Sequence, residues 1–354
     1  MKIRKLIFAA TVLLVSLQTF AQDFNVAGWI QPVPETAKFG LPDYMVWCGS
    51  MVKGNDGKYY LFYSRWPRSS GHYAWATESE VALAVAEKPT GPYKHVKVIL
   101  PKRDKSYWDA DVTHNPTVYK FGKKYYLYYM GTKGTEKFSK KVTMQDAGWW
   151  EYRNNQRIGV AVASSPLGPW VRPDKPTVDT TMYSFDHQIT SNPAVTKRHD
   201  GKYQMVYKGV SQGKMPFGGK VLHGVAIADK PEGPFKKLPN RIFVKDGEQF
   251  AAEDPFIWYQ QGKYWAIVKD MKGVFTNAGT SLALFESADG MDWKLSKHAL
   301  VSTTQIPFVS GKKQVMKLER PQLWLDKGKP KVLFCAVYDG DDNYNVAIPL
   351  KFKK

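Results

Sequence analysis

The segment NPTVYKFGKKYYLYY at residues 115–129 combines an apolar strand, a glycine-containing turn and a second strand rich in tyrosine. Related segments occur at residues 49–63 (GSMVKGNDGKYYLFY), 192–207 (NPAVTKRHDGKYQMVY), 254–268 (DPFIWYQQGKYWAIV) and 320–334 (RPQLWLDKGKPKVLF). The starting positions of these five copies are 66, 77, 62 and 66 residues apart. A repeat of this period is the strongest structural signal in the sequence.

A third apolar strand follows the pair in four copies, at residues 81–86, 158–163, 223–228 and 281–286, and a fourth, outer strand is expected after it. About sixty to seventy residues in four antiparallel strands is the size of one propeller blade. We therefore predict an all-β fold, a five-bladed β-propeller with four-stranded antiparallel blades, as a single domain over residues 22–354. An open array of repeats or a sandwich of short strands is the alternative.

The last repeat runs out one strand short, after residues 347–350. Residues near Phe24 to Ile30 are predicted to supply the missing strand and so close the ring, which would hide the exposed sheet edges. No helical period of useful length interrupts the strands. The longest insertion, Thr135 to Gln156, is predicted to form a loop over the pocket.

Residues 1–21 have the order of a secretory signal peptide. Lys2, Arg4 and Lys5 precede an apolar run at residues 6–17, and Thr19-Phe20-Ala21 offers a cleavage site. No stretch reaches the roughly 20 apolar residues that a membrane span needs. The mature protein is therefore expected in the periplasm or outside the cell, without membrane attachment. A retained N-terminal anchor is the alternative.

The formal charge of +19 becomes +16 when the three positive charges of residues 1–21 are removed. Such a charge favours acidic partners through long-range attraction. Nucleic acid is excluded as a partner class, because the compartment is wrong and no helix-turn-helix, finger or RNA-binding motif is present. An anionic glycan, sulfated or uronic, fits better, and a solubilising lysine-rich surface is the alternative. The protein is expected to be a monomer.

Cys48 and Cys335 are the only cysteines. Both fall inside apolar strands, which favours buried, unpaired thiols over a disulfide.

The first strand of each blade lines the channel of a propeller, so the leading ends of these strands should meet in one cavity. The equivalent positions are Gly49, Asn115, Asn192, Asp254 and Arg320. The residues immediately before them are Cys48, His114, Ser191, Glu253 and Glu319. Carboxyl groups near one axis are costly to bury unless they are paired or used, so the chemistry is expected there.

Several short segments resemble those of the five-bladed propeller glycoside hydrolases, the superfamily that holds families 43, 32 and 117. They are Glu253-Asp254-Pro255, Trp108-Asp109-Ala110-Asp111, the Gly-Lys-Tyr-Tyr hairpins and the segment from Ser165 to Trp170. The resemblance implies a glycosidase that works by carboxylic acid and base catalysis. Together with the signal peptide and the positive charge, it predicts a secreted enzyme that removes a terminal sugar from an anionic or decorated polysaccharide fragment of plant or algal type. The sequence departs from the family at the start of the first repeat, where Gly49-Ser50 replaces the expected acid.

The candidates for acid, base or nucleophile are Asp111, Glu253, Asp254, Asp186 and Glu319. The candidates for substrate binding are Asp43, Trp47, Arg65, Trp108, Asp109, His114, Asn115, His187, Asn192, Lys208, Lys269 and Arg320. Among these, Arg65, Lys208 and Lys269 are predicted to place three cations on one rim for a carboxylate or sulfate. Trp47, Trp66, Trp108 and Tyr183 are candidate sugar platforms.

Two other functions remain open on the same fold. A non-catalytic glycan-binding propeller is suggested by the missing acid of the first repeat, and a phosphorylase or polysaccharide lyase would use similar side chains. No cofactor is expected. A divalent ion such as calcium in the channel is a lesser alternative, since no tight ligand spacing supports it.

Overall fold

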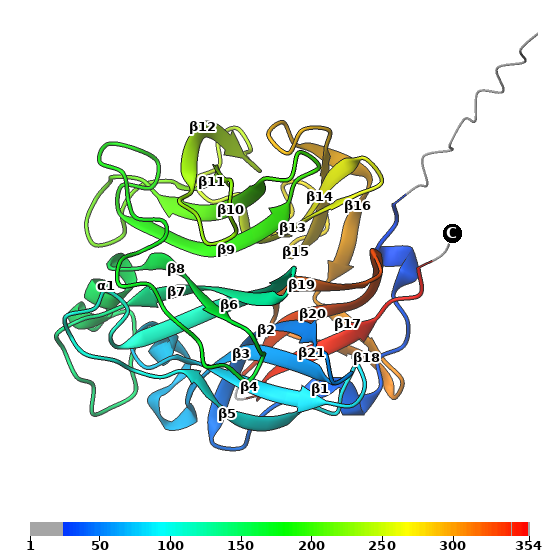
Figure 1. Cartoon of the computed structure of the whole chain (residues 1–354), viewed down its shortest axis with the longest axis horizontal. Coiled ribbons are helices and arrows are strands. Elements are labelled where there is room, and N and C mark those ends of the chain that lie inside the picture. Colours follow the sequence, from blue (N-terminus) through cyan, green and yellow to red (C-terminus); the bar gives the residue numbers. More distant parts are fainter. Residues whose placement is uncertain (1–23, 341, 353–354) are drawn as a thin grey trace, which may run out of the picture.

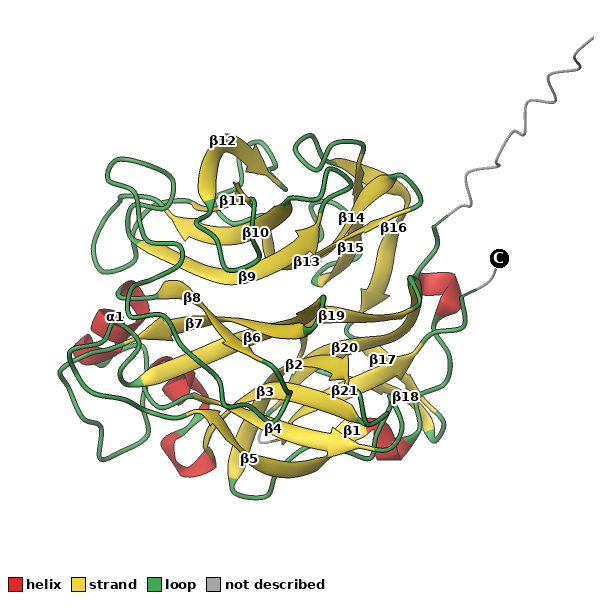
Figure 2. Ribbon diagram, viewed as in Figure 1, coloured by secondary structure: helices red, strands yellow, loops and turns green. Residues whose placement is uncertain are grey.

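The computed structural model describes residues 24–340 and 342–352, which form a five-bladed β-propeller. The predicted signal peptide lies outside the described residues. The strands surround a common centre (Figure 1), and the few helices lie at the edges of the molecule (Figure 2). No helix in the described part of the chain is long and apolar enough to cross a membrane.

Each blade is an antiparallel sheet that runs outward from the centre. The first contains β2 (Tyr44–Lys53), β3 (Tyr59–Pro67), β4 (Glu80–Ala86) and β5 (Lys94–Leu100). The second contains β6 (Val112–Phe121), β7 (Lys124–Thr132) and β8 (Arg157–Ala163). The third contains β9 (Ile189–Lys197), β10 (Tyr203–Val210), β11 (Val221–Ala228) and β12 (Lys236–Ile242). The fourth contains β13 (Ala252–Gln260), β14 (Lys263–Asp270), β15 (Ser281–Ser287) and β16 (Lys294–Thr303).

The fifth blade is completed by the start of the described chain. It contains β19 (Lys317–Asp326), β20 (Lys329–Asp339), β21 (Asp342–Pro349) and the outer strand β1 (Lys38–Phe39). The prediction that residues near Phe24 to Ile30 form this strand is wrong in position. Those residues contribute the short 3-10 helix η1 (Ala27–Trp29) and a single bridge from Ile30 to Leu350. Phe24 instead stacks on Trp265 of the fourth blade, and its ring is buried there.

Two details depart from the simple repeat. The second blade has three strands, and the place of its fourth is taken by isolated bridges from Val162 to Val171 and from Ile158 to Val178. A separate hairpin of β17 (Gln305–Phe308) and β18 (Gly311–Gln314) joins the fourth and fifth blades.

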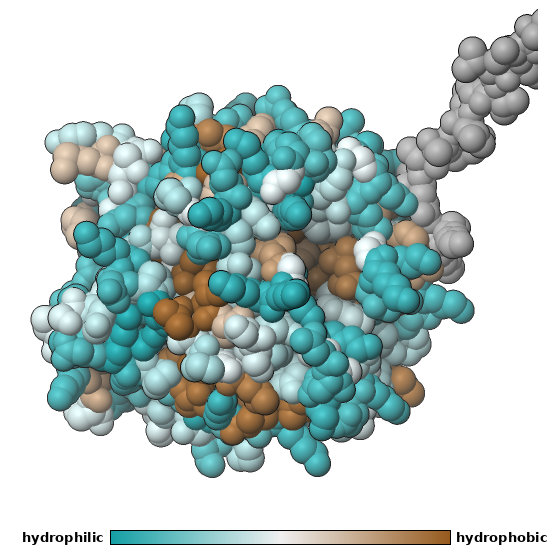
Figure 3. Space-filling model, viewed as in Figure 1, coloured by the Kyte–Doolittle hydropathy of each residue, from teal (hydrophilic) through white to brown (hydrophobic). Residues whose placement is uncertain are grey.

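Apolar clusters fill the spaces between neighbouring blades. Phe62 of the first blade packs in one cluster with Leu127 of the second, and Tyr128 of the second blade packs in another with Tyr207 of the third. Burying a large apolar side chain stabilises the fold by roughly 1.5–3 kcal/mol. The face of the molecule seen in Figure 3 is mostly hydrophilic, with hydrophobic side chains gathered around a hollow near its middle. Cys48 and Cys335 are buried and unpaired, as predicted.

Candidate active site

The five innermost strands β2, β6, β9, β13 and β19 each carry a β-bulge at the same point. One residue in each bulge has a left-handed backbone, with φ between 52° and 55°, and glycine or proline follows it. These residues are Cys48, Asn115, Asn192, Asp254 and Arg320. The first-blade equivalent of Asn115 is therefore Cys48, and the predicted alignment at Gly49 is wrong by one residue. Strain repeated at one point of a fold is typical of a functional site.

The side chains of the five left-handed residues are joined by hydrogen bonds around the propeller axis and are here called the axial ring. Cys48 donates to Asn115 Oδ1 at 2.6 Å, and Asn115 donates to Asn192 Oδ1 at 2.6 Å. Asn192 and Arg320 both donate to Asp254 Oδ1, at 2.7 and 3.1 Å. Arg320 lies close to Cys48 at the end of this chain of bonds, where its charge acts on the thiol pKa. Burial raises the pKa of the Cys48 thiol well above its usual value, so it takes part as a neutral donor.

Four members of the axial ring, Asn115, Asn192, Asp254 and Arg320, line a cavity of about 240 Å³. The residues that precede the ring members are called the second layer; they are Trp47, His114, Ser191, Glu253 and Glu319, and all but Ser191 line the cavity. Because a bulge sends two successive side chains to one side, where a regular strand would alternate them, Glu253 and Asp254 both line the cavity. Glu319 and Arg320 do so for the same reason.

Two lysines hold the carboxylates of this second layer. Lys208 Nζ lies 2.8 Å from Glu253 Oε1, and Lys269 Nζ lies 3.6 Å from Glu253 Oε2. Lys269 also forms an ion pair with Glu319. Lys269 is opposite Glu253 in the β13–β14 register, and Lys208 is opposite Ser191 in the third blade. Both lysines thus occupy one equivalent position of the repeat.

The two adjacent acids of the fourth blade have opposite pKa shifts. Burial alone would raise the pKa of Glu253, but Lys208 and Lys269 outweigh it and lower the pKa to about 2. Burial and then the charge of Glu253 raise the pKa of Asp254 to about 6, although Arg320 opposes them. Both hydrogen bonds that Asp254 accepts end on Oδ1, which leaves Oδ2 for the cavity. Paired groups with separated pKa values are the arrangement expected of an acid and a base.

Histidines and aromatic rings form the wall of the cavity. His114 bonds Ser79 through Nδ1 at 2.7 Å and stacks on Trp75 at 5.3 Å, and burial lowers its pKa well below the usual value. Burial also lowers the pKa of His72 to about 4, so both rings are neutral at pH 7. Trp47 and Trp66 line the same wall.

Part of this wall comes from the connection between β3 and β4, which sequence reasoning missed. It contains η3 (Arg68–Ser70) and η4 (His72–Ala76), and it brings His72, Tyr73 and Trp75 to the cavity. Met271 and Lys317 were missed as well. None of these residues belongs to the repeated pattern. The aromatic-rich stretch from His72 to Trp75 is the one feature of the sequence that could have indicated part of the cavity wall.

The insertion Thr135 to Gln156 supports the wall from behind and does not line the cavity. It contains the helix α1 (Ala147–Asn154), which the sequence analysis did not predict. Trp149 of this helix is buried, and its indole nitrogen donates to the Tyr73 carbonyl at 2.8 Å.

The structure brings eleven of the predicted residues to this cavity. They are Glu253, Asp254, Glu319, Trp47, Trp66, His114, Asn115, Asn192, Lys208, Lys269 and Arg320. The other eight do not line it.

Asp109 and Asp186 anchor the segments that lead into the innermost strands. Asp109 accepts from the Tyr129 hydroxyl at 2.7 Å and from Arg103 at 2.5 Å, and Asp186 accepts from the Tyr207 hydroxyl at 3.0 Å. Lys237 also contacts Asp186, at 2.5 Å. Both carboxylates are fully buried away from the cavity, which corrects their assignment to catalysis or substrate binding on geometric grounds.

Asp111 and Trp108 belong to the same kind of segment. Asp111 pairs with Lys105 at 2.6 Å and accepts the Gly134 N–H at 3.1 Å. Trp108 stacks on Tyr129 with the ring centres 5.7 Å apart. Neither residue lines the cavity.

The cavity is also not lined by Arg65, His187 or Asp43. Arg65 pairs with Glu80 at 2.8 Å, because Ser64 and not Arg65 is opposite the second-layer residue Trp47 in the first blade. A shift of one residue turns a strand side chain to the other face. His187 accepts the Tyr183 N–H at 3.1 Å in a turn, and Tyr183 is exposed there. Asp43 lines an adjoining surface pocket with Arg68, which shares His72 and Tyr73 with the cavity.

No group of three or more His, Cys, Asp or Glu side chains that could hold a metal ion occurs within residues 24–340 and 342–352. The carboxylates of the cavity are occupied by lysine and arginine, which leaves them poor ligands for a divalent ion.

No protein-family model and no curated protein matches the chain. Solved structures are similar to it at low sequence identity. A family 117 glycoside hydrolase of the marine bacterium Zobellia galactanivorans is 18% identical over 91% of this chain and 89% of its own, with a TM-score of 0.61. A structure described as a glycoside hydrolase is 12% identical over 92% and 93%, with a TM-score of 0.66. A Bacillus subtilis arabinanase is 17% identical over 88% and 96%, with a TM-score of 0.56. These similarities show the propeller fold.

Proposed function

We propose that this protein is a glycoside hydrolase whose reaction takes place in the cavity above the axial ring. One observation carries the proposal: Glu253 and Asp254 line one cavity while their pKa values are shifted to about 2 and about 6. In this scheme Asp254 protonates the leaving oxygen and ionised Glu253 activates water or attacks the sugar carbon. The solved structures of this fold that are described as glycoside hydrolases support the same class of reaction.

The remaining groups of the cavity suit a sugar. Trp47, Trp75 and Tyr73 present flat rings on which the apolar face of a sugar can stack. Glu319, held by Lys269, is a positioning group that fixes the ammonium contacting Glu253.

The charge of the cavity favours an anionic substrate. Its lining contains the cations Lys208, Lys269, Lys317 and Arg320 against the carboxyl groups of Glu253, Asp254 and Glu319. With Asp254 protonated, two positive charges are in excess. We propose that the substrate is a sulfated or uronic saccharide, from which a terminal sugar is removed. We further propose that the enzyme is a monomer and acts outside the cytoplasm.

Single substitutions test the assignment. Glu253→Gln and Asp254→Asn should each lower kcat by about 10²–10⁴-fold on the saccharide that the wild type cleaves, since each removes one proton-transfer or nucleophilic group. The substrate is found by screening sulfated, uronic and arabinose-containing oligosaccharides. Asp111→Asn is the matched control, because Asp111 lies outside the cavity, and it should keep activity within about twofold. Full turnover by Glu253→Gln would exclude the proposed roles.

A non-catalytic glycan-binding protein is the second candidate. Two observations favour it. Asn115 and Asn192 are amides at the repeat position where the fourth blade has the acid Asp254, and Glu253 is paired with lysines. In that case calorimetry would show binding of an oligosaccharide that is never cut. Phosphate-dependent release or an unsaturated uronide product would identify a phosphorylase or a lyase instead.

A further inference from the structure

A second cavity, of about 470 Å³, opens at the opposite end of the channel. All five innermost strands contribute to it with their second halves, at residues 50–53, 118–121, 195–197, 256–259 and 322–326. The axial ring precedes these residues in every strand, so it separates this cavity, here called the lower cavity, from the candidate active site. The volume is within the range of roughly 300–1,000 Å³ that small-molecule sites occupy.

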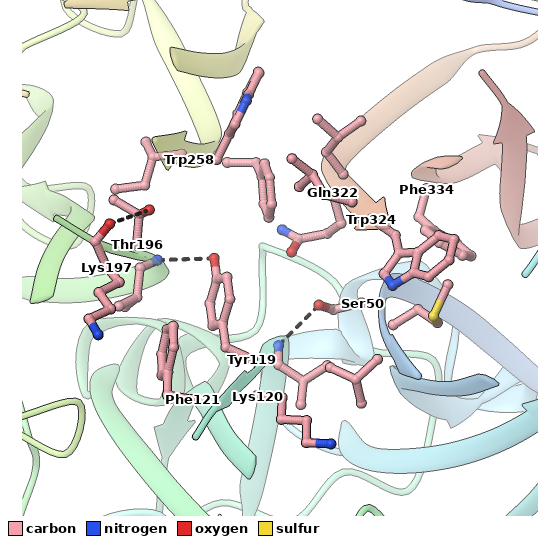
Figure 4. Close-up of a pocket in the computed structure, with 18 of the residues that line it drawn as sticks. Ser50, Tyr119, Lys120, Phe121, Thr196, Lys197, Trp258, Gln322, Trp324 and Phe334 are labelled. Carbon is pink, nitrogen blue, oxygen red and sulfur yellow. Dashed lines mark hydrogen bonds between the residues drawn. The ribbon is translucent and has the colours of Figure 1, made fainter. Parts of the chain in front are cut away.

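Gln322 is the reason to consider the lower cavity a binding site. Its side chain is directed toward the middle of the cavity (Figure 4), and only 2% of the residue is exposed. Neither its amide nitrogen nor its amide oxygen has a hydrogen-bond partner. Leaving a buried polar group unpaired costs about 1–3 kcal/mol, which a ligand with a donor and an acceptor would recover. A sugar hydroxyl is both.

Aromatic rings from three blades surround this amide. Tyr119 and Phe121 are stacked at 5.4 Å in the second blade, and Tyr119 lies parallel to Phe256 of the fourth blade at 6.4 Å. Trp258 and Trp324 complete the lining (Figure 4). Flat rings around one amide are the usual composition of a sugar site, since the rings stack on C–H faces while the amide binds hydroxyls.

The rim of the lower cavity is basic. Lys53, Lys120 and Lys197 are exposed there, and Asp326 is the only acid in the lining, so the rim has a surplus of two positive charges. Charge of this sign attracts carboxylate or sulfate groups.

We infer that the lower cavity is a second, non-catalytic site that binds one unit of an acidic saccharide through Gln322. This inference goes beyond the proposed function and does not depend on it, because no residue of the active-site cavity takes part.

The test uses the whole mature protein in the Glu253→Gln form, so that a substrate would not be consumed. Calorimetry and tryptophan fluorescence are recorded with oligogalacturonide and carrageenan oligosaccharides, and with arabinotriose as the neutral probe. We expect an acidic probe to bind at a site that Gln322→Leu weakens at least tenfold. Leu is similar in size, and removing an unpaired buried amide should not unfold the protein.

The double variant Lys120→Met and Lys197→Met tests the rim without touching the interior, and it should weaken the same site by at least threefold. The single variant Trp47→Ala is the matched control in the other cavity, and it should leave the Gln322-dependent site unchanged. Absence of a Gln322-dependent site for both acidic probes would overturn the inference. Equal binding of arabinotriose would overturn the acidic specificity. The proposed hydrolysis is tested separately by turnover of Gln322→Leu alone, which should equal that of the wild type.

Discussion

At the scale of single residues, position within the bulge decides what each acid can do. Glu253 meets two lysines in the second layer, whereas Asp254, the next residue, enters the axial ring beside Arg320. The two carboxyl groups therefore differ in protonation at mildly acidic pH, although they are neighbours in the chain. The sequence predicted both residues as candidates, but it could not assign roles, because the lysines that separate the pKa values come from other strands.

The pH dependence of kcat/KM follows from these shifts. The reaction needs Asp254 protonated and Glu253 ionised, so the rate should be highest between about pH 2 and pH 6 and fall as the pH rises through about 6. A pH–rate profile of the wild type over pH 4–9 checks this expectation. A rate that rises steadily from pH 5 to pH 8 would contradict the role of Asp254.

The same shift affects folding with a defined sign. Because the pKa of Asp254 is raised in the folded protein, its contribution favours folding at pH values below the ordinary carboxyl pKa. This contribution is lost as the pH rises through about 6. For Glu253 the pKa is lowered, so its contribution is present above the ordinary value and is lost as the pH falls toward about 2.

At the scale of elements, the segments before β6 and β9 use one repeated device. Trp108 lies against Gly131 and Gly159, Phe185 lies against Gly209 and Gly224, and an aspartate follows each aromatic residue. The acid is bonded by a tyrosine hydroxyl in both blades. The sequence pattern predicts Asp109 and Asp186 as active-site groups, because each lies shortly before the start of an innermost strand. Proximity to a strand start does not show on which side of the strand a residue lies.

The glycines of this device should be intolerant of side chains. A Cβ on Gly224 would lie 2.3 Å from the Phe185 ring, so Gly224→Ala should lower the free energy of unfolding by roughly 1–3 kcal/mol. Gly40→Ala is the control, since the nearest atom to its Cβ would be 3.6 Å away, and it should change stability by less than about 0.5 kcal/mol. Denaturant unfolding measures both. Equal stability of the two variants would show that Phe185 is free to move.

At the scale of the whole molecule, the repeat predicts the fold well and the closure less well. Five copies of one strand pattern were enough to predict five blades, since a blade cannot bury its faces alone. The closing strand was misplaced because β1 is only two residues long and has no pattern of its own. Its register is set by β21, where Lys38 is opposite Val346 and Phe39 is opposite Asn345.

Closure gives a prediction about global stability. Phe39 is 4% exposed and contacts Tyr63 of the first blade at 4.8 Å, so it joins the last blade to the first. Phe39→Ala should lower the free energy of unfolding by roughly 3–5 kcal/mol. Val309→Ala, at a residue that is 71% exposed, is the control and should have little effect. An unchanged unfolding midpoint for Phe39→Ala would mean that this contact does not hold the ring closed.

The central claim is that the carboxyl groups of this cavity hydrolyse a glycosidic bond, and the most direct test is to follow the oxygen of water during turnover. The wild type and Glu253→Gln are incubated in water enriched in ¹⁸O with the acidic oligosaccharide that the wild type cleaves, and the masses of the products are measured by mass spectrometry. Hydrolysis predicts one ¹⁸O atom at each new reducing end with the wild type, and a rate about 10²–10⁴-fold lower with the variant. Products without ¹⁸O, or equal rates for the two proteins, would contradict hydrolysis by the carboxyl groups of this cavity.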